Sequence, residues 1–292
     1  MGERVLVSGA TSGIGRAIAI RLAARAAAIG VMGRRRDVAE EVAAEIRQAG
    51  CEAVVLVADV GQASQVETAV KDFIMVKGGL ETVVSSAGIT VTAPVKDFAL
   101  GDWERIFATN LSGTFYLAKY TLPHLLESKG TFTAISSDAG THGAPGYGAY
   151  CATKHGVNGL IKCMALEYGR QGVRCNAVSP GFVETPMAHQ LFEKMSAAEL
   201  DYYKNSVPLG RFASAAEVAA VVDHITSSEA GYTNGLLYAL DGGSTAGYYS
   251  CSTCHRQGTM SAGSAAGGRA AADAGPGGVS QSGATPSAAQ AV

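Results

Sequence analysis

The sequence predicts an α/β fold, a single domain with a doubly wound, parallel, seven-stranded sheet and helices on both faces. Three observations lead to this prediction. Apolar runs rich in β-branched residues recur along the chain, segments of helical length separate them, and a glycine-rich turn joins the first run to the first helix. Strands that alternate with helices form right-handed βαβ crossovers, which produce a parallel sheet covered on both faces.

The seven strand candidates are short apolar runs of the kind that parallel sheets bury. Between them, apolar residues recur every three or four positions, as over 38–48 and 102–126, which indicates helices. The segment 186–204 mixes methionine and aromatic residues with polar ones, and we expect either a lid over an apolar pocket or an ordinary surface helix. The strand candidates occupy residues 4–8, 29–32, 53–58, 82–87, 131–136, 174–179 and 236–240.

Composition and charge narrow the classes of partner. The chain has 292 residues, 16% of them charged, and a formal net charge of −2, so neither nucleic acid nor an anionic membrane surface is expected to attract it. No apolar run reaches the roughly 18 to 20 residues of a membrane-spanning helix, and no secretory leader precedes "RVLVSG". The six cysteines are interpreted as reduced thiols, and a cytoplasmic location is expected.

The composition changes near Gly247. All the strand candidates lie within residues 1–247, the predicted catalytic domain, whereas residues 248–292 are mostly Ala, Gly and Ser. Such a segment cannot bury enough apolar area to offset its ordering entropy, so a disordered tail is expected. Its "CSTCH" at 251–255 has the spacing of a haem-attachment motif, but no further ligands accompany it, and we interpret it as a chance match. No metal site is predicted.

The turn "SGATSGIG" at residues 8–15 links the first strand to the first helix. Gly9, Gly13 and Gly15 allow the backbone to turn tightly and to approach a pyrophosphate, while the start of the helix supplies N–H donors and a positive dipole end. This combination is typical of a Rossmann-type dinucleotide-binding fold. We therefore predict a nicotinamide dinucleotide cofactor.

A cluster of arginines follows the second strand. In a Rossmann-type fold this strand ends beside the adenosine ribose, where a carboxylate would bind the ribose hydroxyls and repel a 2′-phosphate. Here Gly33 is followed by Arg34, Arg35 and Arg36, and the first acid is Asp37. A charge-assisted contact to phosphate contributes roughly 1.5 to 3 kcal/mol. We predict that Arg34 selects NADPH (NADP+), with NADH as the weaker alternative cofactor; the competing interpretation is a solvated surface cluster.

A tyrosine and a lysine in "GYGAYCATKHG" (146–156) are candidates for proton transfer. Tyr150 and Lys154 are four residues apart, so a helix places them on one face. The phenol has an ordinary pKa of about 10, and we expect a neighbouring ammonium and an oxidised nicotinamide ring to lower it. Ser137 follows the strand 131–136, at the edge of the sheet where active-site residues of open parallel sheets gather.

Taken together, these segments resemble the short-chain dehydrogenase/reductase family over about residues 4–247. "ADV" (58–60), "SSAG" (85–88), "FATNLSG" (107–113) and "SPGFVETPM" (179–187) follow the glycine turn in the family's order, and Ser137 stands thirteen residues before Tyr150, as in the family. The resemblance implies that the catalytic residues are Asn110, Ser137, Tyr150 and Lys154. It implies that the cofactor is held by Gly9, Thr11, Ser12, Gly13, Ile14, Gly15, Arg34, Arg35, Asp59, Val60, Ala87, Gly88, Tyr150, Lys154, Pro180, Gly181, Val183 and Thr185.

The resemblance also implies roles for single residues. Ser137 would donate a hydrogen bond to the substrate carbonyl, Asn110 would hold a water in a relay to Lys154, and Thr185 would contact the cofactor carboxamide. Ser85 and Ser86 stand where the family usually has two asparagines that tie the central strands together, so local stability or cofactor fit could differ. A homotetramer, or a homodimer, is the assembly that the family implies.

Three functions are consistent with these residues. The leading hypothesis is an NADPH-dependent reductase of a ketone, of the carbonyl, 3-oxoacyl or polyketide type. The second is a catabolic NAD-dependent alcohol or diol dehydrogenase, which cofactor preference distinguishes from the first. The third is a non-catalytic dinucleotide-binding regulator, which the presence of Ser137, Tyr150 and Lys154 disfavours. Since no cluster of basic residues lies in 138–149 or 186–204, a neutral ketone or a thioester-linked chain fits better than a small keto acid.

Overall fold

All seven predicted strands lie in one parallel sheet. The computed structural model describes residues 2–193 and 195–247, so the predicted tail at 248–292, with its "CSTCH" segment, lies outside the described residues. The strand order is β3-β2-β1-β4-β5-β6-β9, and every neighbouring pair is parallel. The strands are β1 (Glu3–Ser8), β2 (Ala26–Gly33), β3 (Glu52–Val57), β4 (Thr82–Ser85), β5 (Thr131–Ile135), β6 (Arg174–Pro180) and β9 (Leu237–Leu240).

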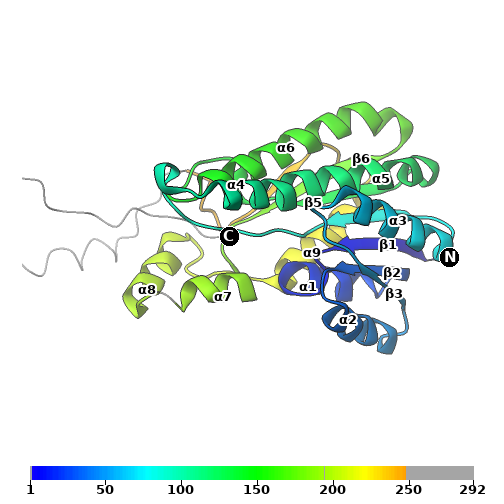
Figure 1. Ribbon diagram of the computed structural model, residues 1–292, viewed down its shortest axis with the longest axis horizontal. Helices are drawn as coiled ribbons and strands as arrows, with labels where there is room; N and C mark the ends of the chain where they lie inside the picture. The colour runs from blue at the N-terminus through cyan, green and yellow to red at the C-terminus, as the bar shows by residue number, and fades with distance from the viewer. Residues whose placement is uncertain (1, 194, 248–292) are drawn as a thin grey trace, which may run out of the picture.

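Two layers of helices cover the sheet, as Figure 1 shows. One apolar core lies between the sheet and α3, α5 and α6, and a second lies between the sheet and α1, α2 and α9. The predicted helices on both faces are thereby confirmed. The helices are α1 (Gly13–Leu22), α2 (Arg36–Gln48), α3 (Ala63–Lys77), α4 (Leu100–Ile106), α5 (Gly113–Ser128), α6 (Gly148–Tyr168), α7 (Pro186–Phe192), α8 (Ala197–Ser206) and α9 (Ala215–Thr226).

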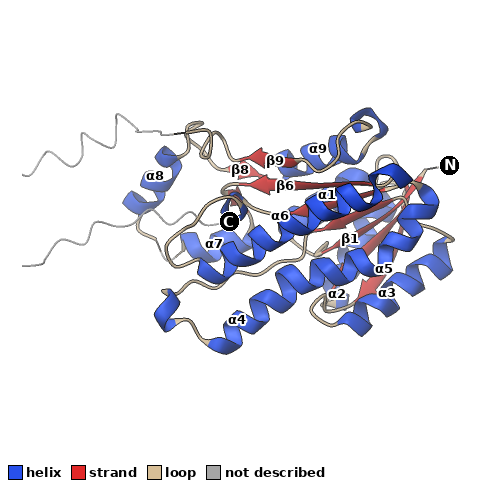
Figure 2. Cartoon of the chain, turned by 90° about the horizontal axis from the view of Figure 1, so that it is seen from above, coloured by secondary structure: helices blue, strands red, loops and turns tan. Residues whose placement is uncertain are grey.

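The helix predicted over 102–126 is interrupted by a π-helical turn. The turn spans Phe107–Ser112 and joins α4 to α5, which Figure 2 shows as one continuous run. Such turns insert an extra residue into a helix and often accompany functional sites. Asn110 lies within it and is buried. Hydrophobic periodicity did not predict this turn, because one extra residue hardly changes a pattern of apolar positions.

The segment 186–204 forms two short helices, α7 and most of α8. In Figure 1 these helices lie at the end of the molecule opposite the N-terminus, where the carboxyl ends of the strands also lie. A small sheet of β7 (Val183–Glu184) and β8 (Ala213–Ser214) joins the two ends of this region and was not predicted. Each strand has two residues, which is too short for an alternating pattern to appear. No helix in the part of the chain that the structure describes is long and apolar enough to cross a membrane.

The core predicts the effect of two substitutions on the same helix. Phe73 of α3 is fully buried against the sheet, whereas Met75 is 78% exposed. Phe73→Ala should lower the free energy of unfolding by about 3 to 5 kcal/mol, because it removes buried apolar surface and leaves a cavity. Met75→Ala should change it by less than about 0.5 kcal/mol. Urea unfolding followed by circular dichroism measures both changes. Equal unfolding midpoints for the two variants would contradict the burial of Phe73 in this core.

Candidate active site

A cleft of about 270 Å³ opens where the strands end. Its walls come from the segments that directly follow β1, β2, β3 and β4, and β7 and the start of α7 close another side. The order of the sheet reverses between β1 and β4, and ligands of doubly wound folds bind at this switch point. The cleft is lined by Gly9, Thr11, Ser12, Gly13, Ile14, Gly15, Gly33, Arg34, Arg35, Ala58, Asp59, Val60, Ser86, Ala87, Gly88, Ile89, Thr109, Ile135, Ser136, Tyr150, Lys154, Val183, Thr185, Pro186 and Met187.

All but two of the residues predicted to hold the cofactor line this cleft. Pro180 and Gly181 do not: Pro180 ends β6 within the sheet, and the N–H of Gly181 donates to the carbonyl of Leu240 at 3.0 Å. Several lining residues, including Ile89 and Thr109, were not predicted from the sequence. Most of these lie next to a predicted residue, so adjacency along the chain was the available signal.

The glycine turn leaves no room for side chains. Gly9 and Gly13 have φ values of +68° and +51°, which favour glycine. A Cβ on Gly9 would lie 2.7 Å from the backbone of Ala87, and a Cβ on Gly15 would lie 2.3 Å from the carbonyl oxygen of Gly9. The first turn of α1 carries no acidic residue, so its N–H groups and dipole face the cleft without a competing negative charge. The turn therefore fits the pyrophosphate of a dinucleotide.

Serines hold the ends of β1 and β4 together. The Ser8 hydroxyl accepts hydrogen bonds from the N–H groups of Ser86 at 3.2 Å and of Ala87 at 3.4 Å. Ser85, one of the two residues that replace the family's asparagines, lies 3.1 Å from the Thr114 hydroxyl of α5. The side chain of Ser85 therefore ties β4 to α5, and that of Ser8 ties β1 to the segment after β4.

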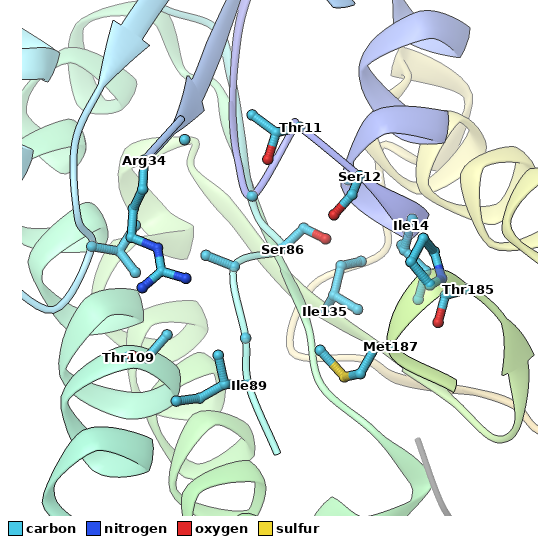
Figure 3. A pocket seen from close by; sticks show the side chains of 18 of the residues that line it. Thr11, Ser12, Ile14, Arg34, Ser86, Ile89, Thr109, Ile135, Thr185 and Met187 are labelled. Atoms are coloured by element: carbon cyan, nitrogen blue, oxygen red, sulfur yellow. The ribbon is translucent and has the colours of Figure 1, made fainter. Parts of the chain in front are cut away.

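Two of the three clustered arginines line the cleft. Arg34 and Arg35 line the cleft, and Arg36 begins α2 and does not. Figure 3 shows the Arg34 side chain extending from the end of β2 into the cleft. Within residues 2–193 and 195–247, Arg34 forms no ion pair, although thirteen other pairs occur there. Its guanidinium is thus available to an anionic ligand.

Three of the predicted catalytic residues meet at the start of α6. Tyr150 is 3% exposed, and the hydroxyl of Ser137, which follows β5, is close enough to influence its pKa. The Lys154 Nζ lies 5.5 Å from the centre of the Tyr150 ring and donates to the carbonyl of Ile135 at 2.8 Å. This hydrogen bond anchors the lysine to the end of β5. Helix α6 therefore presents the phenol and the ammonium together, as the spacing of Tyr150 and Lys154 predicted, and the end of β5 adds the hydroxyl of Ser137.

Burial controls the ionisation of this group. It lowers the pKa of Lys154 to about 8, because an ammonium loses its hydration there. Burial also raises the pKa of Tyr150, and the nearby Asp138 carboxylate raises it further. In the protein alone, desolvation outweighs any lowering of this pKa by the Lys154 ammonium. The phenol is therefore held in its protonated form. The lowering expected from an oxidised nicotinamide ring stays a prediction.

Asn110 reaches the same region from the π-helical turn. Its Oδ1 accepts from the N–H of Ile89 and its Nδ2 donates to the carbonyl of Ile89, both at 2.9 Å. A Cβ on Gly88 would lie 3.6 Å from the Asn110 Oδ1 and 3.9 Å from the Lys154 Nζ, so Gly88 lies close to both side chains. The asparagine thus fixes the loop after β4 beside Lys154. Its predicted part in a water relay stays a prediction.

Aromatic side chains cluster with Tyr150. Phe212 stacks on Phe182 at 5.0 Å and on Phe192 at 4.9 Å between ring centres, and Tyr203 lies 5.6 Å from Phe182. These rings join the buried cluster that contains Tyr150. Helices α7 and α8 supply Phe192 and Tyr203, so the segment 186–204 packs against the site as a lid would. Lys194, a basic residue of this segment, lies outside the described residues.

Neither metal ligation nor disulfide bonding is found among the described residues. No group of three or more His, Cys, Asp or Glu side chains there could hold a metal ion, and Cys51, Cys151, Cys163 and Cys175 are free.

Comparison with known proteins identifies the family. Residues 9–245 match a family model described as enoyl-(acyl carrier protein) reductase. A solved short-chain type dehydrogenase/reductase from Mycobacterium marinum superposes with a TM-score of 0.79 at 29% identity, over 84% of this chain and 96% of that one. The chain belongs to the short-chain dehydrogenase/reductase family. It is therefore an oxidoreductase of alcohol and ketone groups, in a family that binds nicotinamide dinucleotides.

Members of the short-chain dehydrogenase/reductase family similar to this chain act on different compounds. It is 33% identical to meso-2,3-butanediol dehydrogenase of Serratia marcescens, over 83% of this chain and 94% of that protein. It is 32% identical to a 3-oxoacyl-[acyl-carrier-protein] reductase of Thermotoga maritima, over 83% and 97%. A gluconate 5-dehydrogenase from Burkholderia cenocepacia J2315, solved in complex with NADP and tartrate, has a TM-score of 0.79 at 30% identity, over 85% and 96%.

The glycine turn predicts a selective loss of cofactor binding. Gly15→Ala should raise the Kd for a nicotinamide dinucleotide at least about tenfold, equivalent to 1.4 kcal/mol, because the new methyl group would displace the carbonyl of Gly9. Gly101→Ala is the control, since Gly101 lies in α4 with no atom within 4 Å of an added Cβ. Titration of cofactor fluorescence measures both. Unchanged affinity in Gly15→Ala would mean that the turn does not contact the pyrophosphate.

Proposed function

We propose that the protein is an NADPH-dependent reductase of a neutral ketone or a thioester-linked 3-oxoacyl chain, carried out by the domain at residues 1–247. The observation that carries the proposal is Arg34, a guanidinium without an ion pair within the described residues that extends into the cleft at the end of β2. No carboxylate stands at this position to bind the ribose hydroxyls. The NADP bound to the Burkholderia relative supports the same choice.

The catalytic roles follow from the positions of the side chains. When bound, the cofactor supplies the hydride that reduces the carbonyl carbon. Tyr150, which burial keeps protonated, donates its phenolic proton to the carbonyl oxygen as negative charge develops there. Ser137, whose hydroxyl neighbours the phenol, donates a hydrogen bond to the same substrate oxygen. Lys154, held by the carbonyl of Ile135, places positive charge near the tyrosine ring and would contact the cofactor ribose.

The substrate class is inferred from the aromatic cluster. Phe182 and Phe212 belong to the buried apolar cluster that contains Tyr150, and Phe192 packs against it; such apolar surroundings suit an apolar ketone or an acyl chain. The resemblance to 3-oxoacyl-[acyl-carrier-protein] reductase supports this inference. The resemblance to butanediol and D-threitol dehydrogenases favours a second candidate, the oxidation of an alcohol or diol with NAD+ by the same residues.

We also propose that the protein assembles as a homotetramer or a homodimer. Trp103 and Phe115 are 42% and 46% exposed on α4 and α5, and Leu166 is 85% exposed on α6. Such apolar side chains on one helical layer support an interface between copies of the chain.

Arg34 should determine cofactor choice. Arg34→Ala should raise the KM for NADPH roughly 10- to 100-fold, because it removes a charge-assisted contact of about 1.5 to 3 kcal/mol, and should leave the KM for NADH nearly unchanged. Arg36→Ala is the control, since Arg36 is an exposed neighbour that does not line the cleft. Initial rates with each cofactor measure the effect. An equal loss with both cofactors would assign Arg34 to structure and not to selection.

A substrate panel tests the function itself. With NADPH, kcat/KM for a cyclic ketone and for a 3-oxoacyl thioester should exceed that for pyruvate. Tyr150→Phe should lower these rates by about 10² to 10⁴ while cofactor binding is retained, because only the transferable proton is lost. Higher activity with pyruvate would contradict the substrate class. Faster oxidation of 2,3-butanediol with NAD+ would favour the second candidate, and full activity of Tyr150→Phe would contradict the mechanism.

A further inference from the structure

Asp138 is a buried acid that neither the family motif nor the proposed mechanism uses. It follows Ser137 and opens a short 3-10 turn, Asp138–Gly140, and it is 2% exposed. Its Oδ1 accepts hydrogen bonds from the Ser137 hydroxyl at 2.8 Å and from the N–H of Ala139 at 2.7 Å. Its Oδ2 is buried and has no hydrogen-bond partner among the described residues. An unsatisfied buried carboxylate oxygen is costly, so it calls for a physical explanation.

The charge of this carboxyl group depends on its surroundings. Burial raises the pKa of Asp138, and the nearby Asp241 carboxylate adds to this effect. Hydrogen bonds from Ser137 and Ala139 oppose it, as does His142 when it is charged. Asp138 therefore changes from its neutral to its ionised form at a higher pH than an exposed aspartate does. The titratable groups that interact with Asp138 are Tyr147, Tyr150 and Cys151 of α6 and its start, His142 of the following loop, and Asp241 after β9.

The hydrogen bond to Ser137 limits what the serine can do. An ionised carboxylate has no hydrogen to donate, so the hydrogen shared by the two residues belongs to Ser137. A serine hydroxyl has only one hydrogen. While it points at Asp138, Ser137 can accept from Tyr150 but cannot donate to a substrate oxygen. Protonation of Asp138 would place its hydrogen on Oδ2, since Oδ1 already accepts two hydrogen bonds, and would make Oδ1 a weaker acceptor.

We propose that Asp138 is a positioning residue that holds the Ser137 hydroxyl hydrogen away from the substrate while ionised, and releases it when Oδ2 takes up a proton. The proton comes from solvent, one O–H bond forms, and no other covalent bond changes. The inference rests on the proposed role of Ser137 in binding the substrate oxygen. Neutralisation of Asp138 also removes a negative charge beside the Tyr150 hydroxyl, so that the phenolate becomes easier to form in alcohol oxidation.

The pH profile of ketone reduction tests this proposal. In the wild type, kcat/KM for cyclohexanone with NADPH should fall as pH rises through the titration of Asp138, because the ionised form withholds the serine hydrogen. Asp138→Asn cannot ionise, so this fall should be absent, and the variant should exceed the wild type several-fold on the alkaline side. Oxidation of cyclohexanol with NADP+ should shift its midpoint to lower pH in the same variant. Identical profiles for the two proteins would overturn the proposal.

A matched variant separates charge from structure. The Thr141 hydroxyl donates to the backbone carbonyl of Asp138 at 2.8 Å, so Thr141→Val disturbs the same turn without changing its charge. Thr141→Val should keep the pH profile of the wild type. A shift equal to that of Asp138→Asn would mean that the turn, and not the carboxyl charge, controls the rate, and would also overturn the proposal.

A measurement of the carboxyl titration itself needs no turnover. In ¹³C NMR of the aspartate carboxyl carbons, one signal should titrate above the range of the others, and it should be lost in Asp138→Asn. If every aspartate titrates in the ordinary range, the proposal is wrong. Failure of the proposed function would appear differently, as a wild type that reduces no ketone in the panel or a Tyr150→Phe variant that retains full activity.

Discussion

The close contact between the glycine turn and the end of β4 is the constraint on which the site depends. Gly9 lies so near the backbone of Ala87 that a methyl group could not fit, and Gly15 approaches the carbonyl of Gly9 more closely still. Ser8 fixes this contact by accepting the N–H groups of Ser86 and Ala87. The chain segments that follow β1 and β4 continue to opposite faces of the sheet. The contact between the glycine turn and the end of β4 therefore forms the floor of the cleft. The arginines and the catalytic side chains take their positions relative to that floor.

The sheet and most of the cleft could be predicted because their signals are local. Buried parallel strands are continuous apolar runs, and strand ends in such a sheet meet at one edge, so Ser137 and Arg34 were placed from their positions in the chain. Structure without a local signal was missed, namely the π-helical turn at 107–112 and the two-residue strands β7 and β8. Whether Pro180 faces the cleft or the sheet depends on tertiary packing, which the sequence does not display.

Asp138 shows why the electrostatics of the site could not be predicted from spacing. In the sequence it is one acid in a loop, and an exposed aspartate there would be an ordinary charged residue. Burial beside Ser137 and Tyr150 is what makes its charge matter. The same reasoning corrects the expected ionisation of Tyr150. Proximity of Lys154 along the helix was visible in the sequence, but the loss of water from both groups was not, and that loss dominates.

The anchored position of Lys154 has a thermodynamic consequence. Its pKa of about 8 in the folded protein lies below the ordinary value of about 10.4, so between these values the unfolded chain binds more protons than the folded one. Stability from this residue therefore rises with pH across that interval, and the cost of burying the ammonium is fully present below it. At a pH where Lys154 is partly neutral, a ligand that binds more tightly to the ammonium form takes up protons from the medium as it binds. Its apparent enthalpy of binding then varies with the ionisation enthalpy of the buffer.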